Sequence, residues 1–434
     1  MTTLSRLDEY INTLYIIDTH EHLPMEKDRP AKTDVLEEWL THYFSSDLVS
    51  AGLSNRDLSV VRDSSKDIML RWKLVEPFWH AARSTGYGRS LELAARDLYG
   101  IDEINRKTIR PLNAAFLAAR AKGNHYEYVL GKKSRIAVSI VDPCLYPVSK
   151  SAGRFVSALN IRPFLMPAHA RDLRAQEDRT GIKIHCLEDW EEATRRLIED
   201  AFKPGCNVVC LKCGMAYLRT LRFDKPARSE AEQAFNELFA DRNLPDRRPP
   251  VRLAPAFENH MMHFICRLAD RKGLTIQVHT GLQEDNGNLI YDSNPALLSN
   301  LFLEYQDARF DLFHMGYPYT QELSSLAKNF RNVSIDMCWG HIISPEAARR
   351  ALIEWLDAVP ANKISAFGGD YCFVDGVYGH QKLARRNVAM ALAAKVEDGS
   401  FDFERAKEIA HWLFIDNPAR IFNLEKIPES RPRI

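Results

Sequence analysis

Short apolar segments alternate with amphipathic, helix-length segments over most of the chain. Residues 207–212 and 274–279 are rich in Val, Ile and Leu and predict buried strands. Residues 188–202 and 345–358 carry apolar side chains at the spacing of one helix face. Nearly continuous apolar strands that alternate with helices are typical of a parallel sheet with helices on both faces.

This pattern predicts eight strands, which matches a (β/α)8 TIM barrel. The expected strands span residues 15–19, 135–141, 162–166, 207–212, 274–279, 310–314, 333–336 and 364–367. An open, doubly wound sheet is the alternative. That fold usually carries a glycine-rich phosphate loop after its first strand, whereas this first strand runs into His20-Glu21-His22. The sequence therefore favours the α/β barrel.

A long helical segment separates the first expected strand from the second. Residues 24–133 show helical periodicity, and a structureless loop of that length is uncommon in a compact domain. We therefore predict a helical insertion or cap at 24–133 on a barrel formed by residues 1–23 and 134–434. A charged, proline-marked connector is expected at 241–250, and a short amphipathic helix, not a signal peptide, at 1–14.

The charge balance argues against two classes of partner. The chain of 434 residues has 58 basic and 58 acidic side chains, so nothing indicates a nucleic acid or an anionic membrane surface. Nor does an apolar run approach the roughly 18 residues of a membrane span. We expect a small-molecule substrate, and the sequence leaves open whether copies of the chain form a homo-oligomer.

The cysteines point to a reducing compartment. Eight of them are scattered through apolar segments, without the density of a disulfide scaffold. Cys210 and Cys213 form a CxxC, but on a strand these positions face opposite sides, and no second pair completes a zinc knuckle. The expected location is the cytoplasm.

Side chains with metal-ligand chemistry stand where strands are expected to end. His20 and His22 leave the first strand on one side, because positions i and i+2 share a face. Asp18 and Glu21 are expected to support this pair from its other face. Further strand ends supply Lys212, His279, His314 and Asp370. In a barrel of this kind, the carboxyl ends of the strands form the active site.

Together these residues predict a metal centre. Imidazole and carboxylate suit Zn, Mn, Fe or Co, with positions left open for water. A divalent cation lowers the pKa of bound water and polarises a carbonyl, and Asp370 could take the water's proton and return it to a leaving group. We predict one or two divalent cations, zinc first, held by His20, His22, Lys212, His279, His314 and Asp370, with Asp370 and Lys212 as catalytic residues.

Lys212 has three alternative roles, because a lysine at a buried strand end is costly unless it is paired or functional. Its amine could be carbamylated by CO2 and bridge two cations. It could stay an ammonium and bind a substrate carboxylate. It could also form an ion pair with a neighbouring acid. The sequence leaves these three readings open.

These residues resemble the amidohydrolase superfamily of metal-dependent barrels. The chain is most similar to the amidohydrolase-like half of fungal FluG and plant nodulin/glutamine-synthetase fusion proteins, on the segments 85–102, 208–220, 276–288, 313–337 and 416–422. The resemblance implies a hydrolase of an amide, ester or lactone bond, with one or two divalent cations. The same superfamily contains uronate isomerases, which share HxH and a helical insertion but lack the fourth-strand lysine, and metal-dependent decarboxylases. A non-catalytic scaffold is the remaining alternative.

The substrate contacts are expected from aromatic and basic side chains near the strand ends. Arg89, in the glycine-flexed segment 85–89, could hold a carboxylate in bidentate fashion, or it could be a surface arginine at a helix start. The candidate substrate-binding residues are Tyr87, Arg89, Tyr217 and Trp339.

Overall fold

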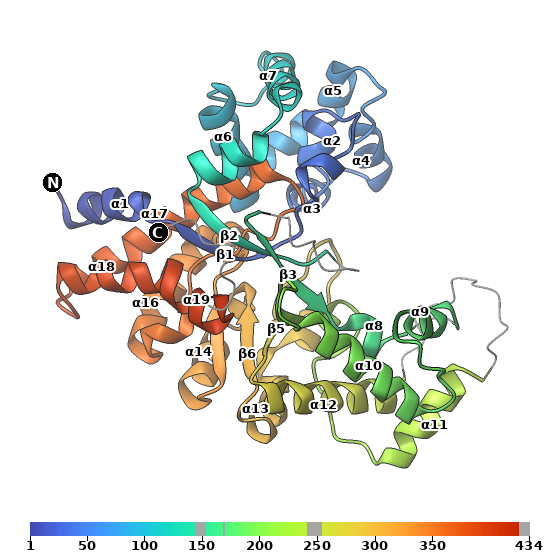
Figure 1. Ribbon diagram of the computed structural model, residues 1–434. Coiled ribbons are helices and arrows are strands. Elements are labelled where there is room, and N and C mark those ends of the chain that lie inside the picture. Colours follow the sequence, from blue (N-terminus) through green and yellow to red (C-terminus); the bar gives the residue numbers. More distant parts are fainter. Residues whose placement is uncertain (144–152, 168–169, 241–253, 425–434) are drawn as a thin grey trace.

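Eight parallel strands form the core of the protein (Figure 1). The computed structural model describes residues 1–143, 153–167, 170–240 and 254–424, so the connector expected at 241–250 lies outside the described residues. Neighbouring strands pair in chain order. They are β1 (Ile16–Glu21), β2 (Ile136–Val141), β3 (Phe155–Asn160), β4 (Val208–Cys213), β5 (Thr275–His279), β6 (Arg309–Phe313), β7 (Val333–Asp336) and β8 (Ile364–Ser365). The predicted TIM barrel is confirmed.

The barrel is completed by the segment that follows β8. The main-chain N–H of Thr19 donates to the carbonyl of Phe367 at 3.1 Å, and its hydroxyl donates to the same carbonyl at 3.0 Å. The N–H of Asp370 donates to the carbonyl of His20 at 2.8 Å. These bonds bring the last strand end of the chain against the first.

Helices surround the strands. Those between β3 and the last described residue are α8 (Arg162–Leu165), α9 (Ala170–Thr180), α10 (Leu187–Ala201), α11 (Arg228–Leu238), α12 (Pro255–Lys272), α13 (Ser299–Glu304), α14 (Thr320–Asn329), α15 (Gly340–Ile343), α16 (Pro345–Ala358), α17 (Val374–Glu397), α18 (Phe403–His411) and α19 (Asn417–Ile421). Helix α1 (Thr3–Thr13) packs against α17 and α18. No helix among the described residues is long and apolar enough to cross a membrane.

The third strand was predicted in the wrong place. It lies at Phe155–Asn160, and the segment predicted as a strand, 162–166, begins with the short helix α8. Pro163 stands in the first turn of α8, where a residue without an N–H costs no hydrogen bond. The segment 162–166 holds only five residues, too few to separate a strand period from a helix period, so this proline was the better signal.

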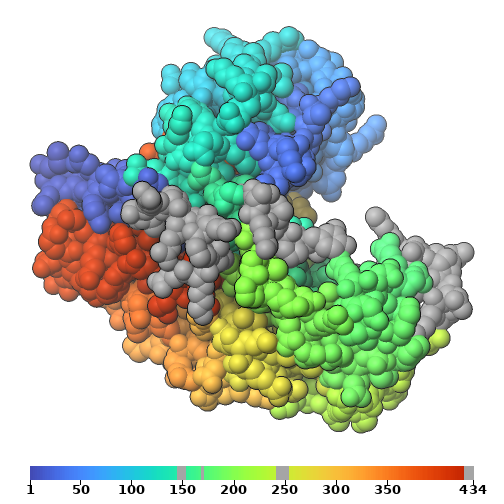
Figure 2. Space-filling model, in the orientation of Figure 1, coloured from blue at the N-terminus to red at the C-terminus, as the bar shows by residue number. Residues whose placement is uncertain are grey.

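Helices also fill the stretch between β1 and β2. They are α2 (Val35–Trp39), α3 (Phe44–Ser50), α4 (Asn55–Val61), α5 (Ile68–Ala82), α6 (Gly86–Tyr99) and α7 (Ile109–Lys122), followed by a π-helical turn at Glu127–Lys133. They form the upper lobe in Figures 1 and 2. The buried carboxylate of Asp375 in α17 accepts hydrogen bonds from Trp39 and Tyr99, at 3.0 and 2.7 Å, and thus ties this lobe to the barrel. The division into two domains stays a prediction.

Candidate metal centre

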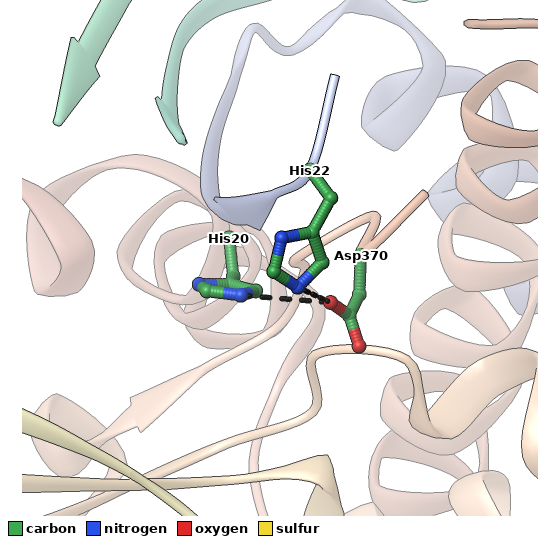
Figure 3. Close-up of side chains that lie close together, drawn as sticks. All are labelled: His20, His22 and Asp370. Atoms are coloured by element: carbon green, nitrogen blue, oxygen red, sulfur yellow. Dashed lines mark ion pairs between the residues drawn. The ribbon is translucent and has the colours of Figure 1, made fainter. Parts of the chain in front are cut away.

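His20, His22 and Asp370 meet at the carboxyl ends of β1 and β8 (Figure 3). The Nε2 atoms of His20 and His22 lie 3.5 and 3.4 Å from the same Asp370 oxygen, Oδ1. The ligand atoms of the three residues all lie within 4.8 Å of one another. The side chain of His22 is 28% exposed, whereas His20 is fully buried, so the group faces solvent on the side of His22.

The other ring nitrogen of each histidine is held by the protein. Nδ1 of His20 lies 3.3 Å from Oε1 of Gln277, and Nδ1 of His22 lies 3.1 Å from the carbonyl oxygen of Asp142. Contacts of this kind fix the ring orientation of metal-binding histidines. Nε2 of His20 is buried and makes no hydrogen bond among the described residues. This nitrogen faces the Asp370 carboxylate but forms no hydrogen bond with it. The arrangement fits a cation bound between the two groups.

The electrostatics favour the ligand form of the imidazole. Burial, and then the charge of Lys212, lower the pKa of His20 well below its ordinary value. Burial raises the pKa of Asp370, which His22 and a hydrogen bond from Tyr43 oppose. His20 is therefore neutral at physiological pH, and a neutral imidazole is the form that binds metal.

Asp370 is held in a left-handed backbone conformation, with φ of 57°. This region costs a residue with a side chain about 1–2 kcal/mol, so its neighbours must hold it. The N–H of Gly369 donates to Oδ1 of Asp18 at 3.0 Å, and the N–H of Tyr371 donates to Oε2 of Glu21 at 2.8 Å. Acids of β1 thus fix the main chain on both sides of Asp370.

The roles expected for these two acids are therefore different from the observed ones. Asp18 and Glu21 were expected to support the histidine pair from its other face. Asp18 and His20 lie two positions apart on β1, but the pairing with β2 shifts register between Asp18 and Glu21, so the alternation of faces does not define the side on which either acid lies. The N–H of His20 lies 3.3 Å from Oδ1 of Asp18. The other hydrogen bonds of Asp18 and Glu21 described above hold the loop that carries Asp370.

His279 and His314 lie together, beside the first three residues. Nδ1 of His279 is 2.9 Å from Nε2 of His314, and Nε2 of His279 is 2.8 Å from the carbonyl oxygen of Leu282. His314 belongs to a second close group with Cys338 and Asp370. His279 is in neither group of ligand atoms, and burial followed by the charge of Lys212 lowers its pKa to about 3.

Lys212 is buried at the end of β4, with its Nζ 3.6 Å from Oδ2 of Asp142. Of the three arrangements that the sequence leaves open, the ion pair is the one that this geometry contains. The lysine lies outside both groups of close ligand atoms. It is near enough to lower the pKa of His20, His279 and His314.

Three of the four candidate substrate-binding residues lie around the histidines. The ring of Trp339 is 5.2 Å from that of His314, and the ring of Tyr217 is 4.7 Å from that of His279. Tyr87 lies parallel to Trp339, with 6.3 Å between ring centroids.

The fourth, Arg89, is not brought to the site. It is exposed on α6 and lines a separate cavity, of about 420 Å³, formed with side chains of α1 and α17 such as Asp8 and Lys382. The reading of Arg89 as a surface arginine at a helix start fits this position.

Sequence reasoning missed three residues that the structure places here. Asp142 directly follows β2, so the rule that found the other strand ends also applied to it. Gln277 stands two positions before His279 on β5 and therefore shares its face. Cys338 follows β7 by two residues, and its buried position gave no signal beyond residue type.

The fold and the site define a TIM barrel with histidine and carboxylate side chains gathered at the carboxyl ends of its strands. Residues 221–424 match the amidohydrolase family model. The fluG protein of Emericella nidulans is 30% identical over 158 residues, which is 36% of this chain and 18% of that protein. Both matches agree with the resemblance to the amidohydrolase superfamily that the sequence motifs indicate.

A uronate isomerase and a glucuronate isomerase are also similar to the chain. That of Cutibacterium acnes is 23% identical over 194 residues, 41% of each protein. The crystal structure of glucuronate isomerase from Caulobacter crescentus superimposes with a TM-score of 0.79 at 20% identity, covering 100% of this chain and 96% of that one. This structural likeness shows a shared fold. The matched segments span less than half the length of either curated relative.

Proposed function

We propose that the chain is a metal-dependent hydrolase that cleaves an amide, ester or lactone bond of a small carboxylated substrate. The observation that carries the proposal is the approach of two Nε2 atoms, from His20 and His22, to one oxygen of Asp370 at 3.5 and 3.4 Å. A divalent cation bound there would polarise a carbonyl and lower the pKa of a coordinated water. Zinc is our first expectation, and Mn, Fe or Co suit the same ligands.

The chain's own groups supply the remaining steps. Oδ1 of Asp370 faces the histidines, so we assign Oδ2 to accept the proton of the attacking water and return it to the leaving group. Burial raises the pKa of this carboxyl, which makes it a stronger base than an exposed aspartate. The buried ammonium of Lys212 offers a positive charge for the substrate carboxylate, in exchange for its 3.6 Å contact with Asp142.

The test is a substrate screen on the full chain after chelation and reloading with Zn or Mn. Amides, N-acyl amino acids, γ-glutamyl compounds and lactones form the panel. We expect turnover of at least one class, and a loss of about 10²–10⁴-fold in Asp370→Asn, the usual contribution of acid–base catalysis. Wild-type turnover by Asp370→Asn with metal bound would contradict the proton-transfer role. Full metal occupancy without turnover of any panel member would contradict the hydrolase.

Isomerisation of a uronate is the second candidate. It is favoured by the structural match to glucuronate isomerase, which covers 100% of this chain, including the helices between β1 and β2. Lys212 at the end of β4 counts against it, since the resemblance to uronate isomerases does not include that lysine. Proton NMR of glucuronate and galacturonate incubated with the loaded protein separates the two. Isomerisation yields a ketose, whereas hydrolysis leaves uronates unchanged.

Several predictions from the sequence accompany this proposal. They are a small-molecule substrate, no nucleic-acid or membrane partner, a cytoplasmic location and an open question of self-association. Gel filtration of the loaded protein measures the last of these.

A further inference from the structure

A second set of ligand atoms lies on the far side of the Asp370 carboxylate. A ring nitrogen of His314, the sulfur of Cys338 and an oxygen of Asp370 all lie within 4.8 Å of one another, and all three residues are buried. Oδ2 of Asp370 is 3.8 Å from Nδ1 of His314, whereas Oδ1 faces His20 and His22. The two oxygens of one carboxylate therefore point to two different groups of ligands.

We propose that His314, Cys338 and Asp370 form a second cation site, which takes a soft divalent metal such as zinc or cadmium and is bridged to the first site by the Asp370 carboxylate. The inference rests on the proposed function in one respect, because Asp370 is shared. Imidazole, thiolate and carboxylate are the ligands that zinc selects in proteins. Binding breaks the S–H bond of Cys338, forms a sulfur–metal bond and releases the proton to solvent.

The main chain places the sulfur against the segment that leads to Asp370. Beyond β7, the N–H of Cys338 donates to Oδ1 of Asp336 at 2.7 Å, and the N–H of Trp339 donates to the carbonyl of Gly368 at 2.9 Å. A Cβ atom at Gly368 would lie 2.7 Å from the sulfur of Cys338. Glycine at this position is therefore what lets the thiol approach the loop of Asp370.

His314 is presented to this site from β6. Its Nδ1 is 3.2 Å from the carbonyl oxygen of Cys338, and its Nε2 is 2.9 Å from Nδ1 of His279. A cation bound through Nδ1 takes the place of the contact with the carbonyl. His279 then keeps its contact with Nε2 and orients the ring of His314, as the outer partners of metal-binding histidines do. This gives His279 a positioning role.

Cobalt titration of the metal-free, full-length protein tests the site. Thiolate ligation of Co²⁺ gives a charge-transfer band in the near ultraviolet, whereas imidazole and carboxylate ligands give only weaker visible bands. We expect visible bands with the first equivalent and the near-ultraviolet band with the second. Cys338→Ser should keep the visible bands, lose the near-ultraviolet band and bind the second equivalent at least tenfold more weakly. Cys266→Ser, a buried cysteine of α12, is the matched control and should behave as wild type.

Other outcomes overturn the proposal. A near-ultraviolet band that persists in Cys338→Ser, or a wild type that binds one equivalent without the band, excludes Cys338 as a ligand. His314→Gln gives a second, independent variant if the serine variant does not fold, and it should lose the same band. His22→Ala separates the two proposals, because it should abolish turnover and the first site's visible bands but keep the thiolate band.

Discussion

Oε2 of Glu21 accepts a hydrogen bond from the main-chain N–H of Tyr371 at 2.8 Å, across the seam between β1 and the segment after β8. This bond fixes the residue directly after Asp370. In Glu21→Ala the acceptor is lost, and we expect cation affinity to fall about 10–100-fold, the usual effect of removing a group that orients a ligand. Competition with a chromophoric chelator measures the affinity.

Glu21→Gln is the matched control for that change. Burial and the neighbouring charge of Asp18 raise the pKa of Glu21 well above its ordinary value, so the glutamine resembles the neutral carboxyl and keeps the acceptor. It should bind the cation as wild type does. An alanine variant with wild-type affinity would show that Glu21 does not position Asp370.

Trp339→Phe should weaken substrate binding while leaving the fold intact. The indole Nε1 is buried and has no hydrogen-bond partner among the described residues. The ring packs parallel to that of Tyr43, with 4.6 Å between centroids, and phenylalanine keeps this stacking. Loss of one hydrogen bond to a substrate oxygen, worth about 1 kcal/mol, raises KM roughly fivefold. An unchanged KM on the substrate found in the screen would remove Trp339 from the binding site.

His341 makes the stability of the metal-free protein sensitive to acid. Burial lowers its pKa to about 4, and its Nε2 lies 2.9 Å from the carbonyl oxygen of Ala366. In the unfolded chain His341 binds a proton near pH 6.5, whereas in the folded protein it binds one only near pH 4. The free energy of unfolding therefore falls as the pH decreases between these values. The free energy of unfolding, measured with urea at several pH values, should depend on pH less steeply in His341→Gln than in wild type. The expected difference in this pH dependence is about 1.4 kcal/mol per pH unit. Equal slopes would mean that His341 is protonated in the folded state.

A second cation should slow the reaction that the first enables. In the proposed reaction Oδ2 of Asp370 accepts the proton. A cation bound between His314 and Cys338 would occupy this oxygen, because Oδ2 lies 3.8 Å from Nδ1 of His314, and Oδ2 could then no longer accept the proton. Turnover should therefore rise with the first equivalent of zinc and fall with the second. Cys338→Ser should keep the rise and lose the fall. Turnover that increases up to two equivalents would instead make the second cation part of catalysis.

The sequence predicted the barrel because buried parallel strands such as β4 and β5 carry their own periodicity. It also placed His20, His22, His314 and Asp370 at one end of the barrel, because the carboxyl ends of parallel strands in a closed barrel face one rim. It failed at α8, where a short apolar run had no decisive period. Arg89 shows the other limit, since the orientation of one helix decides whether its guanidinium faces the site or, as here, a separate surface cavity.

Contacts between distant segments were beyond sequence reasoning. That Oδ1 and Oδ2 of Asp370 face different groups depends on the left-handed main chain at that residue, which bonds to Asp18 and Glu21 some 350 positions away impose. Hydrogen bonds between residues so far apart in the chain cannot be predicted from local sequence propensities.

The seam between β1 and the segment after β8 is also where the ligands of the first site come together. His20 and Asp370 are joined there by a main-chain hydrogen bond of 2.8 Å, and β8 itself spans only Ile364–Ser365. A cation that binds both sides of this seam favours the closed ring over any state in which the last strand detaches, by mass action. The metal would then stabilise the closure of the barrel. The amide hydrogens of Thr19 and Asp370 should exchange with solvent more slowly when the metal is bound than when it is absent.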